Sequence, residues 1–168
     1  MTTEILIYTD GSSHHNGKPN CYAGWSCVFY LGGKMYVRYG HLTAPSSNNR
    51  GEIMGVLFAI DMLRDKPWAL KFHSDSQYVV KSINEWRQKW KKTNYDGVKN
   101  ADLLVPLFNS WDAHGNAKIE WVRGHIGVKG NEIADEFAGY ASSNTKLEKA
   151  DERVNILMVE PDWKPKHG

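Results

Sequence analysis

The chain has 168 residues, of which 41% are hydrophobic and 24% are charged, and its formal net charge at neutral pH is +2. This length suits one compact domain whose core needs neither disulfides nor a structural metal. No apolar run approaches the roughly 20 residues that cross a bilayer, and the first four residues lack the basic start and apolar stretch of a secretory signal. We therefore expect a cytoplasmic protein that does not contact membranes.

The spacing of the cysteines and the distribution of charge bear on which metals, disulfides and binding partners are possible. Cys21 and Cys27 are the only cysteines, and their spacing fits neither a zinc motif nor a disulfide framework, so we expect free thiols. The positive charge is concentrated in one basic segment, residues 84–99. Its cationic side chains are Arg87, Lys89, Lys91, Lys92 and Lys99. This local concentration says more about a polyanionic partner than the small net charge does.

The pattern of apolar residues predicts strands first and then alternating helices and strands. Three strands are expected over residues 5–9, 22–30 and 35–39, with a hairpin turn at 31–34. A helix should begin in the polar residues after Pro45 and end at 65–67. The remaining elements are a strand over 68–73, a helix over 78–86, a polar loop over 94–100, a helix over 101–113, a strand over 119–122 and a helix over 131–141.

This order of elements predicts an α/β layer structure. The first three strands should form an antiparallel meander, and the later strands should join it through helical crossovers. Residues 143–168 are highly charged and contain two prolines, so we expect a weakly structured extension. The short apolar run at 156–159 has the composition to dock on the body.

Four acidic residues stand at positions where they can meet. Asp10 ends the first predicted strand before a Gly-Ser turn, and Asp75 follows the fourth. Glu52 and Asp135 lie in the first turn or two of two predicted helices. Sites in such sheets lie beyond the carboxyl ends of parallel strands, and a carboxylate cluster that stays ionised there requires divalent cations. Oxygen-only ligands favour magnesium or manganese. Individually, Asp10 is equally well read as a turn residue and the helix acids as N-terminal charges.

Four motifs in order give the chain a specific resemblance. They are Tyr8-Thr9-Asp10-Gly11-Ser12, Asn48-Asn49-Arg50-Gly51-Glu52, Ser74-Asp75-Ser76-Gln77-Tyr78-Val79, and Trp121-Val122-Arg123-Gly124-His125-Ile126-Gly127 continuing to Asn131-Glu132-Ile133-Ala134-Asp135. On these motifs the chain resembles a type 1 ribonuclease H over roughly residues 5–141.

The resemblance implies a ribonuclease H-like fold with a mixed five-stranded sheet, three antiparallel strands followed by two parallel ones. It implies hydrolysis of the RNA strand of RNA/DNA hybrids by a two-metal mechanism with Mg²⁺, or Mn²⁺ in its place, leaving 5′-phosphate and 3′-hydroxyl ends. The metal ligands carried over are Asp10, Glu52, Asp75 and Asp135. The catalytic domain would be residues 1–142, including the basic segment, with 143–168 as the extension.

The same resemblance assigns proton transfer and product release to His125, which lies between glycines in the loop before the last helix. An imidazole that titrates near neutrality suits that role, although a lone loop histidine is usually only solvated. Glu132 is equally compatible with support of a metal and with helix capping.

Substrate contacts are also implied. Asn16, Asn48, Asn49 and Gln77 match positions that contact the RNA, and Ser47 and Asn100 match positions that hold a DNA phosphate. Helix capping is the alternative for Asn48 and Asn49, and residues 13–20 depart from the family's usual loop, which leaves the backbone contacts there open.

In the basic segment, Lys89, Lys91 and Lys92 are expected to bind phosphates, Trp90 to contact the substrate and Trp86 to brace the helix. A solvated charged helix is the alternative for the whole segment.

Two other functions fit a fold of this type. A non-catalytic hybrid-binding module would keep the substrate groove but need not keep all four acids, and a DNA recombinase would have no use for residues that read ribose. We expect a monomer without an obligate protein partner.

Overall fold

The computed structural model describes residues 2–124, 128–144 and 157–159. Its strands are β1 (Glu4–His14), β2 (Tyr22–Leu31), β3 (Lys34–Leu42), β4 (Ala69–Ser74), β5 (Ala117–Trp121) and β6 (Leu157–Val159). Its helices are α1 (Asn48–Leu63), α2 (Gln77–Lys81), α3 (Arg87–Lys92), α4 (Ala101–His114) and α5 (Lys129–Ser142), and the π-helical turn η1 (Ser82–Trp86) joins α2 to α3.

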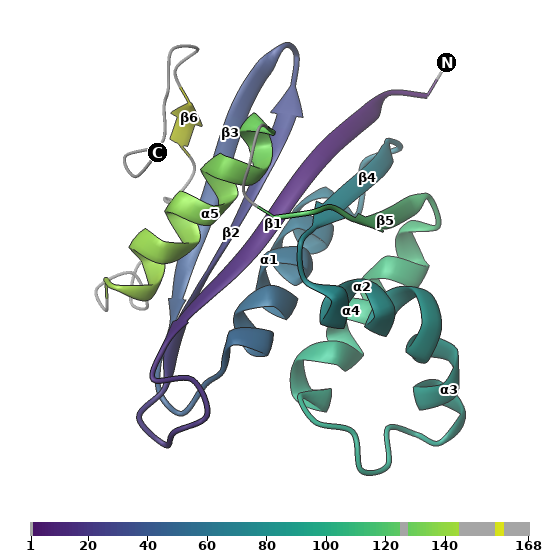
Figure 1. Cartoon of the computed structure of the whole chain (residues 1–168). Helices are drawn as coiled ribbons and strands as arrows, with labels where there is room; N and C mark the ends of the chain where they lie inside the picture. Colours follow the sequence, from purple (N-terminus) through teal and green to yellow (C-terminus); the bar gives the residue numbers. More distant parts are fainter. Residues whose placement is uncertain (1, 125–127, 145–156, 160–168) are drawn as a thin grey trace.

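The strands form one mixed sheet in the order β5-β4-β1-β2-β3-β6 (Figure 1). Antiparallel ladders join β1 to β2 and β2 to β3, whereas β4 pairs in parallel with both β1 and β5. The predicted meander and the mixed five-stranded sheet are therefore confirmed. The short strand β6 adds a further antiparallel partner along β3.

β1 is the centre of the sheet and is longer than predicted. Its parallel ladder to β4 ends where Thr9 pairs with Ser74, but its antiparallel ladder to β2 continues to His14. Asp10 therefore lies in the middle of a strand, and the predicted turn after it is wrong, because the partner strand β2 holds this polar stretch extended. Asp10 still marks the carboxyl end of the parallel pairing, where a site was expected.

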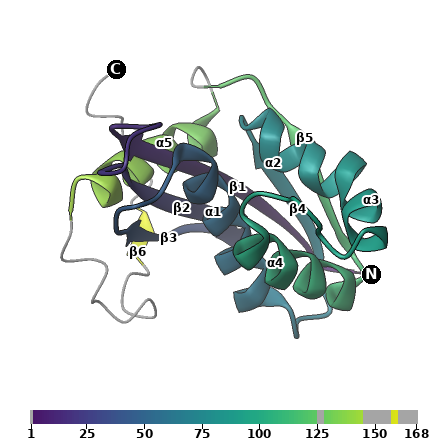
Figure 2. The same ribbon diagram turned by 90° about the horizontal axis from the view of Figure 1, so that it is seen from below.

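Helices cover the two faces of the sheet (Figures 1 and 2). On one face, α1 and α4 bury Ile7, Phe72 and Ile119 in the larger hydrophobic core. On the other face, α5 packs over β1, β2 and β3, and a smaller core joins Val28 to Ile133.

The start of α1 lies directly against β1 and β2. Ser47, rather than Asn48 or Asn49, caps this helix, since its hydroxyl accepts a hydrogen bond from the Arg50 amide. A Cβ on Gly11 would overlap the backbone of Glu52, and one on Gly51 would lie 2.7 Å from the Gly24 carbonyl oxygen. Glycine at these two positions lets the helix and strand backbones touch.

The helix predicted over residues 78–86 is interrupted. The Ser82 hydroxyl donates to the Tyr78 carbonyl oxygen at 2.7 Å, at the point where α2 gives way to η1. Such a bond competes with the regular ladder, and π turns widen a helix locally. Helical structure then continues through α3 as far as Lys92, into the basic segment.

The predicted extension, residues 143–168, lies mostly outside the described residues. Three residues of its apolar run, whose composition allowed docking on the body, form β6, which pairs with β3 in the register Met35 to Val159. Within the described part of the chain, no helix has the length and apolarity needed to span a membrane.

Candidate active site

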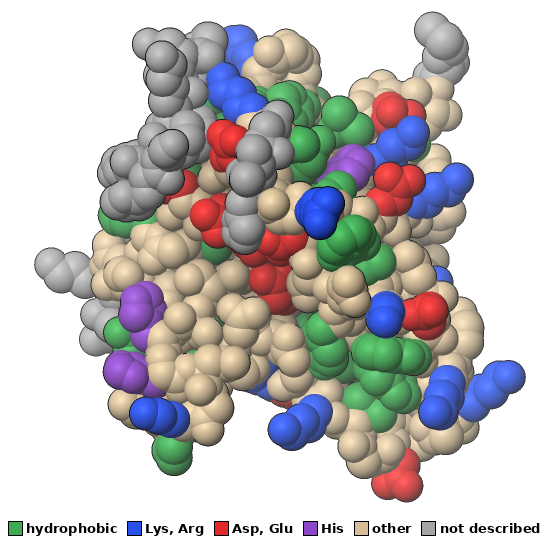
Figure 3. Space-filling model, viewed as in Figure 1, with side chains coloured by type: hydrophobic (Ala, Val, Ile, Leu, Met, Phe, Trp, Pro, Cys, Tyr) green, Lys and Arg blue, Asp and Glu red, His purple; other side chains and the backbone are tan. Residues whose placement is uncertain are grey.

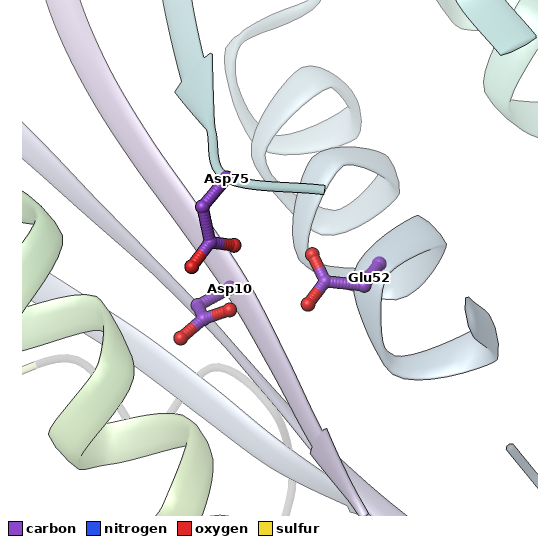
Figure 4. A group of neighbouring side chains, drawn as sticks. All are labelled: Asp10, Glu52 and Asp75. Carbon is purple, nitrogen blue, oxygen red and sulfur yellow. The ribbon is translucent and has the colours of Figure 1, made fainter. Parts of the chain in front are cut away.

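Three acidic side chains converge from three different elements. Asp10 comes from the middle of β1, Glu52 from the start of α1, and Asp75 from the residue after β4. One carboxylate oxygen from each lies within 4.8 Å of the others, and Figure 4 shows the three carboxylates turned toward one another. We call these residues the acidic trio. On the surface, acidic side chains gather in a hollow in the middle of the face drawn in Figure 3.

Hydrogen bonds fix two members of the trio but leave one oxygen without a partner. The Gly11 amide donates to Asp10 Oδ1 and to Glu52 Oε1, at 2.9 Å in both cases. Glu52 Oε2 is buried and has no hydrogen-bond partner among the described residues. A bound cation, a proton or an ordered water would satisfy a buried carboxylate oxygen in this state.

The electrostatics of the trio also favour a cation. Burial raises the pKa of Asp10 well above its usual range, and the charges of Glu52 and Asp75 raise it further. Burial likewise raises the pKa of Glu52 to about 8, although the hydrogen bonds from Asp10 and the Gly11 amide oppose the shift. A hard divalent cation would neutralise these carboxylates, and the all-oxygen donor set suits Mg²⁺ or Mn²⁺.

Asp75 is held by the strand beside it and by the loop that follows β5. Trp121 Nε1 donates to the Asp75 carbonyl oxygen at 3.1 Å, and the Ser76 amide donates to Ser74 Oγ at 3.0 Å. A Cβ on Gly124 would lie 3.0 Å from Asp75 Oδ2. The glycine therefore lets the backbone pass directly beside this carboxylate.

Asp135, the fourth predicted ligand, is exposed in the second turn of α5 and lies outside the trio. Its charge nevertheless raises the pKa of both Asp10 and Glu52, and its role as a metal ligand stays a prediction. Glu132 is partly buried in the first turn of the same helix. His125 lies outside the described residues.

The predicted substrate residues lie at the starts of three helices. Ser47 caps α1, Asn48 and Asn49 begin it, Gln77 begins α2, and Asn100 precedes α4. Asn16 reaches the same region, since its side-chain oxygen accepts from the Asn48 amide at 3.1 Å. Their contacts with a substrate stay predictions.

Arg50 links these helix starts, a role that the sequence did not indicate. It forms a bidentate ion pair with Asp102 of α4 at 2.9 and 2.7 Å. It also donates to Asn100 Oδ1 at 3.3 Å, and Asn100 in turn donates to the Tyr78 hydroxyl at 3.2 Å. Arg50 stands inside a predicted motif, but its partner lies 52 residues away in the chain.

The basic segment divides into paired and unpaired cations. Arg87 and Lys91 both form ion pairs with Asp112 of α4. Lys89 and Lys92 are exposed and form no ion pair within residues 2–124, 128–144 and 157–159. The charge of Lys91 is therefore largely neutralised by Asp112, which leaves it less available to bind phosphate.

The two tryptophans of this segment differ in their packing. Trp90 packs on the larger core, with its ring centroid 6.3 Å from that of Phe108. Trp86 lies between the rings of Tyr78 and Trp90, at 6.3 and 5.5 Å. Trp86 therefore makes the bracing contacts that were expected of it, and Trp90 packs against the core as well. The contact of Trp90 with a substrate stays a prediction.

Comparison with known proteins agrees with the geometry. The family described as RNase H matches residues 2–143. A ribonuclease H from Cupriavidus metallidurans is 40% identical over 149 residues, which cover 84% of this chain and 99% of that protein.

Two solved structures share the fold. LC9-RNase H1, a type 1 RNase H with the type 2 active-site motif, has a TM-score of 0.69 at 24% identity, covering 84% of this chain and 73% of that chain. The foamy viral protease-reverse transcriptase in complex with RNA/DNA hybrid has a TM-score of 0.73 at 19% identity, covering 84% of this chain but 20% of that chain. With the family match over most of its length and a relative at 40% identity, the chain belongs to the ribonuclease H family of endoribonucleases.

Proposed function

We propose that this protein hydrolyses the RNA strand of RNA/DNA hybrids with two Mg²⁺ ions and leaves 5′-phosphate and 3′-hydroxyl ends. The observation that carries this proposal is the acidic trio, in which three carboxylates crowd within 4.8 Å and Glu52 Oε2 lacks a partner among the described residues. Mn²⁺ should replace Mg²⁺, because both accept oxygen ligands in octahedral geometry.

Asp10, Glu52 and Asp75 would hold the ions, with Asp135 completing the set from α5. When bound, the ions activate the attacking water and stabilise charge on the phosphate and on the leaving 3′ oxygen. The Gly11 amide orients two of the carboxylates, and the Trp121 indole fixes the backbone of Asp75. We assign to His125 a role in proton transfer and product release, as its place in the fourth motif implies.

The hybrid is the substrate class that the surrounding side chains fit best. Asn48, Asn49 and Gln77 lie at the starts of the two helices next to the trio. Their side-chain amides suit recognition of a ribose 2′-hydroxyl. Lys89 and Lys92 are exposed and suit phosphate contacts. The name of the Cupriavidus relative and the hybrid bound to the foamy viral enzyme support the same class.

A cleavage assay on labelled hybrid, duplex RNA and duplex DNA of one sequence tests the proposal. We expect Mg²⁺-dependent cleavage of the hybrid alone, with a 5′-phosphate on each new fragment. Asp10→Asn should abolish cleavage while the protein keeps its circular dichroism spectrum and still binds the hybrid. Cleavage by that variant at the wild-type rate would refute the proposed site, and comparable cleavage of duplex DNA would refute the proposed substrate.

A further inference from the structure

Ser26 contacts three of the elements that carry the acids. It is fully buried on β2 and pairs with Asp10 across the β1–β2 ladder. Its hydroxyl donates to the Ala134 carbonyl oxygen of α5 at 2.5 Å, one residue before Asp135. Its own carbonyl oxygen faces α1, where a Cβ on Gly55 would lie 2.8 Å away. No sequence motif singled out this residue.

Ser26 and Asp10 point to the same face of the sheet. Side chains alternate along a strand, so Asp10 shares its face with Tyr8, and Ser26 shares its face with Val28. Tyr8 lies against Gly130 of α5, and Val28 packs with Ile133 of α5. Directly paired residues on one face stand about 5 Å apart. The Ser26 hydroxyl therefore lies between the Asp10 side of the site and the backbone that carries Asp135.

The bond to Ala134 is a tertiary contact rather than part of the helix. In a regular helix the Ala134 carbonyl already accepts the amide four residues later. The hydroxyl of Ser26 adds a second donor, which ties this turn of α5 to the sheet. Two further side-chain anchors, from His14 and His41, reach Ser142 and Ala141 at the opposite end of the helix.

We propose that Ser26 is a positioning residue, which sets how closely Asp135 approaches the acidic trio and thereby sets the Mg²⁺ affinity of the site. This inference rests on the proposed role of Asp135 as a metal ligand. Ser26 itself touches neither metal nor substrate. Supporting side chains of this kind typically change metal affinity by about 10- to 100-fold when removed.

The test compares Ser26→Ala with His41→Phe by calorimetric titration of Mg²⁺ without nucleic acid. Both changes remove one buried side-chain donor to an α5 carbonyl and largely keep the local volume. Ser26→Ala should weaken Mg²⁺ binding by roughly tenfold and speed amide hydrogen exchange around Ala134. His41→Phe should speed exchange only near Ala141 and leave the Mg²⁺ affinity unchanged. Ser26→Cys, which keeps a weak donor, should fall between Ser26→Ala and wild type.

An unchanged Mg²⁺ affinity in Ser26→Ala, or an equal loss in His41→Phe, would overturn the positioning role. Asp135→Asn separates this failure from failure of the proposed metal site. If Asp135→Asn weakens Mg²⁺ binding and Ser26→Ala does not, only the role of Ser26 is wrong. If Asp135→Asn binds Mg²⁺ like the wild type, both the ligand assignment and the positioning role are wrong.

Discussion

At the scale of single residues, the buried acids make the metal-free protein sensitive to pH. The pKa of Glu52 rises from about 4.5 in the unfolded chain to about 8 in the fold. The folded state therefore binds more protons than the unfolded state between these values, so its stability must fall as pH rises through that window. A bound cation removes this penalty, because it stabilises the ionised form.

We expect the melting temperature of the metal-free protein, measured in EDTA, to fall between pH 5 and pH 8. Glu52→Gln should reduce this dependence, since the amide does not ionise and Asp10, whose pKa burial also raises, accounts for the remainder. Added Mg²⁺ should stabilise the wild type more at pH 8 than at pH 5. A wild-type profile as flat as that of Glu52→Gln would show that Glu52 does not titrate in this window.

Gly124 allows a second test at this scale. A methyl group there would lie 3.0 Å from Asp75 Oδ2, so Gly124→Ala should displace the carboxylate and raise the Mg²⁺ concentration needed for half-maximal cleavage. Gly139→Ala in α5 is the matched control, because a Cβ at that position meets nothing within 4 Å. The control should keep normal metal dependence and gain about 0.5–1 kcal/mol of stability from helix propensity. If both variants need the same Mg²⁺ concentration for half-maximal cleavage, the space beside Gly124 does not determine metal binding by Asp75.

At the scale of elements, the basic segment separates cations that support the fold from cations that face solvent. Replacing Lys89 and Lys92 together with Gln should raise KM for the hybrid and reduce the slope of log KM against log salt by up to about 2, near one per phosphate contact. Lys91→Gln should leave that slope nearly unchanged, since its ion pair is with Asp112. Cleavage kinetics across a salt series measures both effects, and a larger slope change in Lys91→Gln would reverse the assignment.

Trp86 and Trp90 should likewise differ in how much each contributes to the stability of the fold. Trp90→Ala should lower the free energy of unfolding by about 2–4 kcal/mol, because Trp90 is partly buried against the core around Phe108. Trp86→Ala should lower it less, since Trp86 packs between the rings of Tyr78 and Trp90 and, within the described structure, is not among the residues that pack against the larger core. Urea unfolding of both variants makes the comparison, and a larger loss in Trp86→Ala would contradict it.

Sequence reasoning succeeded where local pattern and chemistry coincide. Helical spacing located α1 and α5, and the residue types of Asp10, Glu52 and Asp75 indicated a shared site. It failed where structure depends on a distant partner. The extension of β1 past Asp10 needs β2, the satisfied charge of Lys91 needs Asp112, and the role of Ser26 needs α5. None of these partners is visible from local spacing.

At the scale of the whole molecule, β6 covers an edge that the other strands leave open. Its backbone pairs with Met35, Tyr36 and Val37 of β3, and Val159 is buried. Exposed strand edges promote self-association. A chain ended after Asn144 should therefore lose about 1–2 kcal/mol of stability and associate at high concentration, while keeping its cleavage activity. Thermal unfolding and light scattering measure the first two effects, and loss of activity at unchanged stability would give the extension a catalytic role instead.

The two kinds of pairing made by β1 also bear on the order in which the protein matures during synthesis. Its antiparallel ladder to β2 joins neighbours in the chain, so the meander is able to form early. Its parallel ladder must wait until Ser74 has left the ribosome, and Asp75 follows that residue. A nascent chain that carries only Asp10 and Glu52 has an incomplete trio. The ability to cut RNA should therefore arise late, only after β4 has closed onto β1 and α5 has added Asp135, and not while the ribosome is still reading the first half of the message.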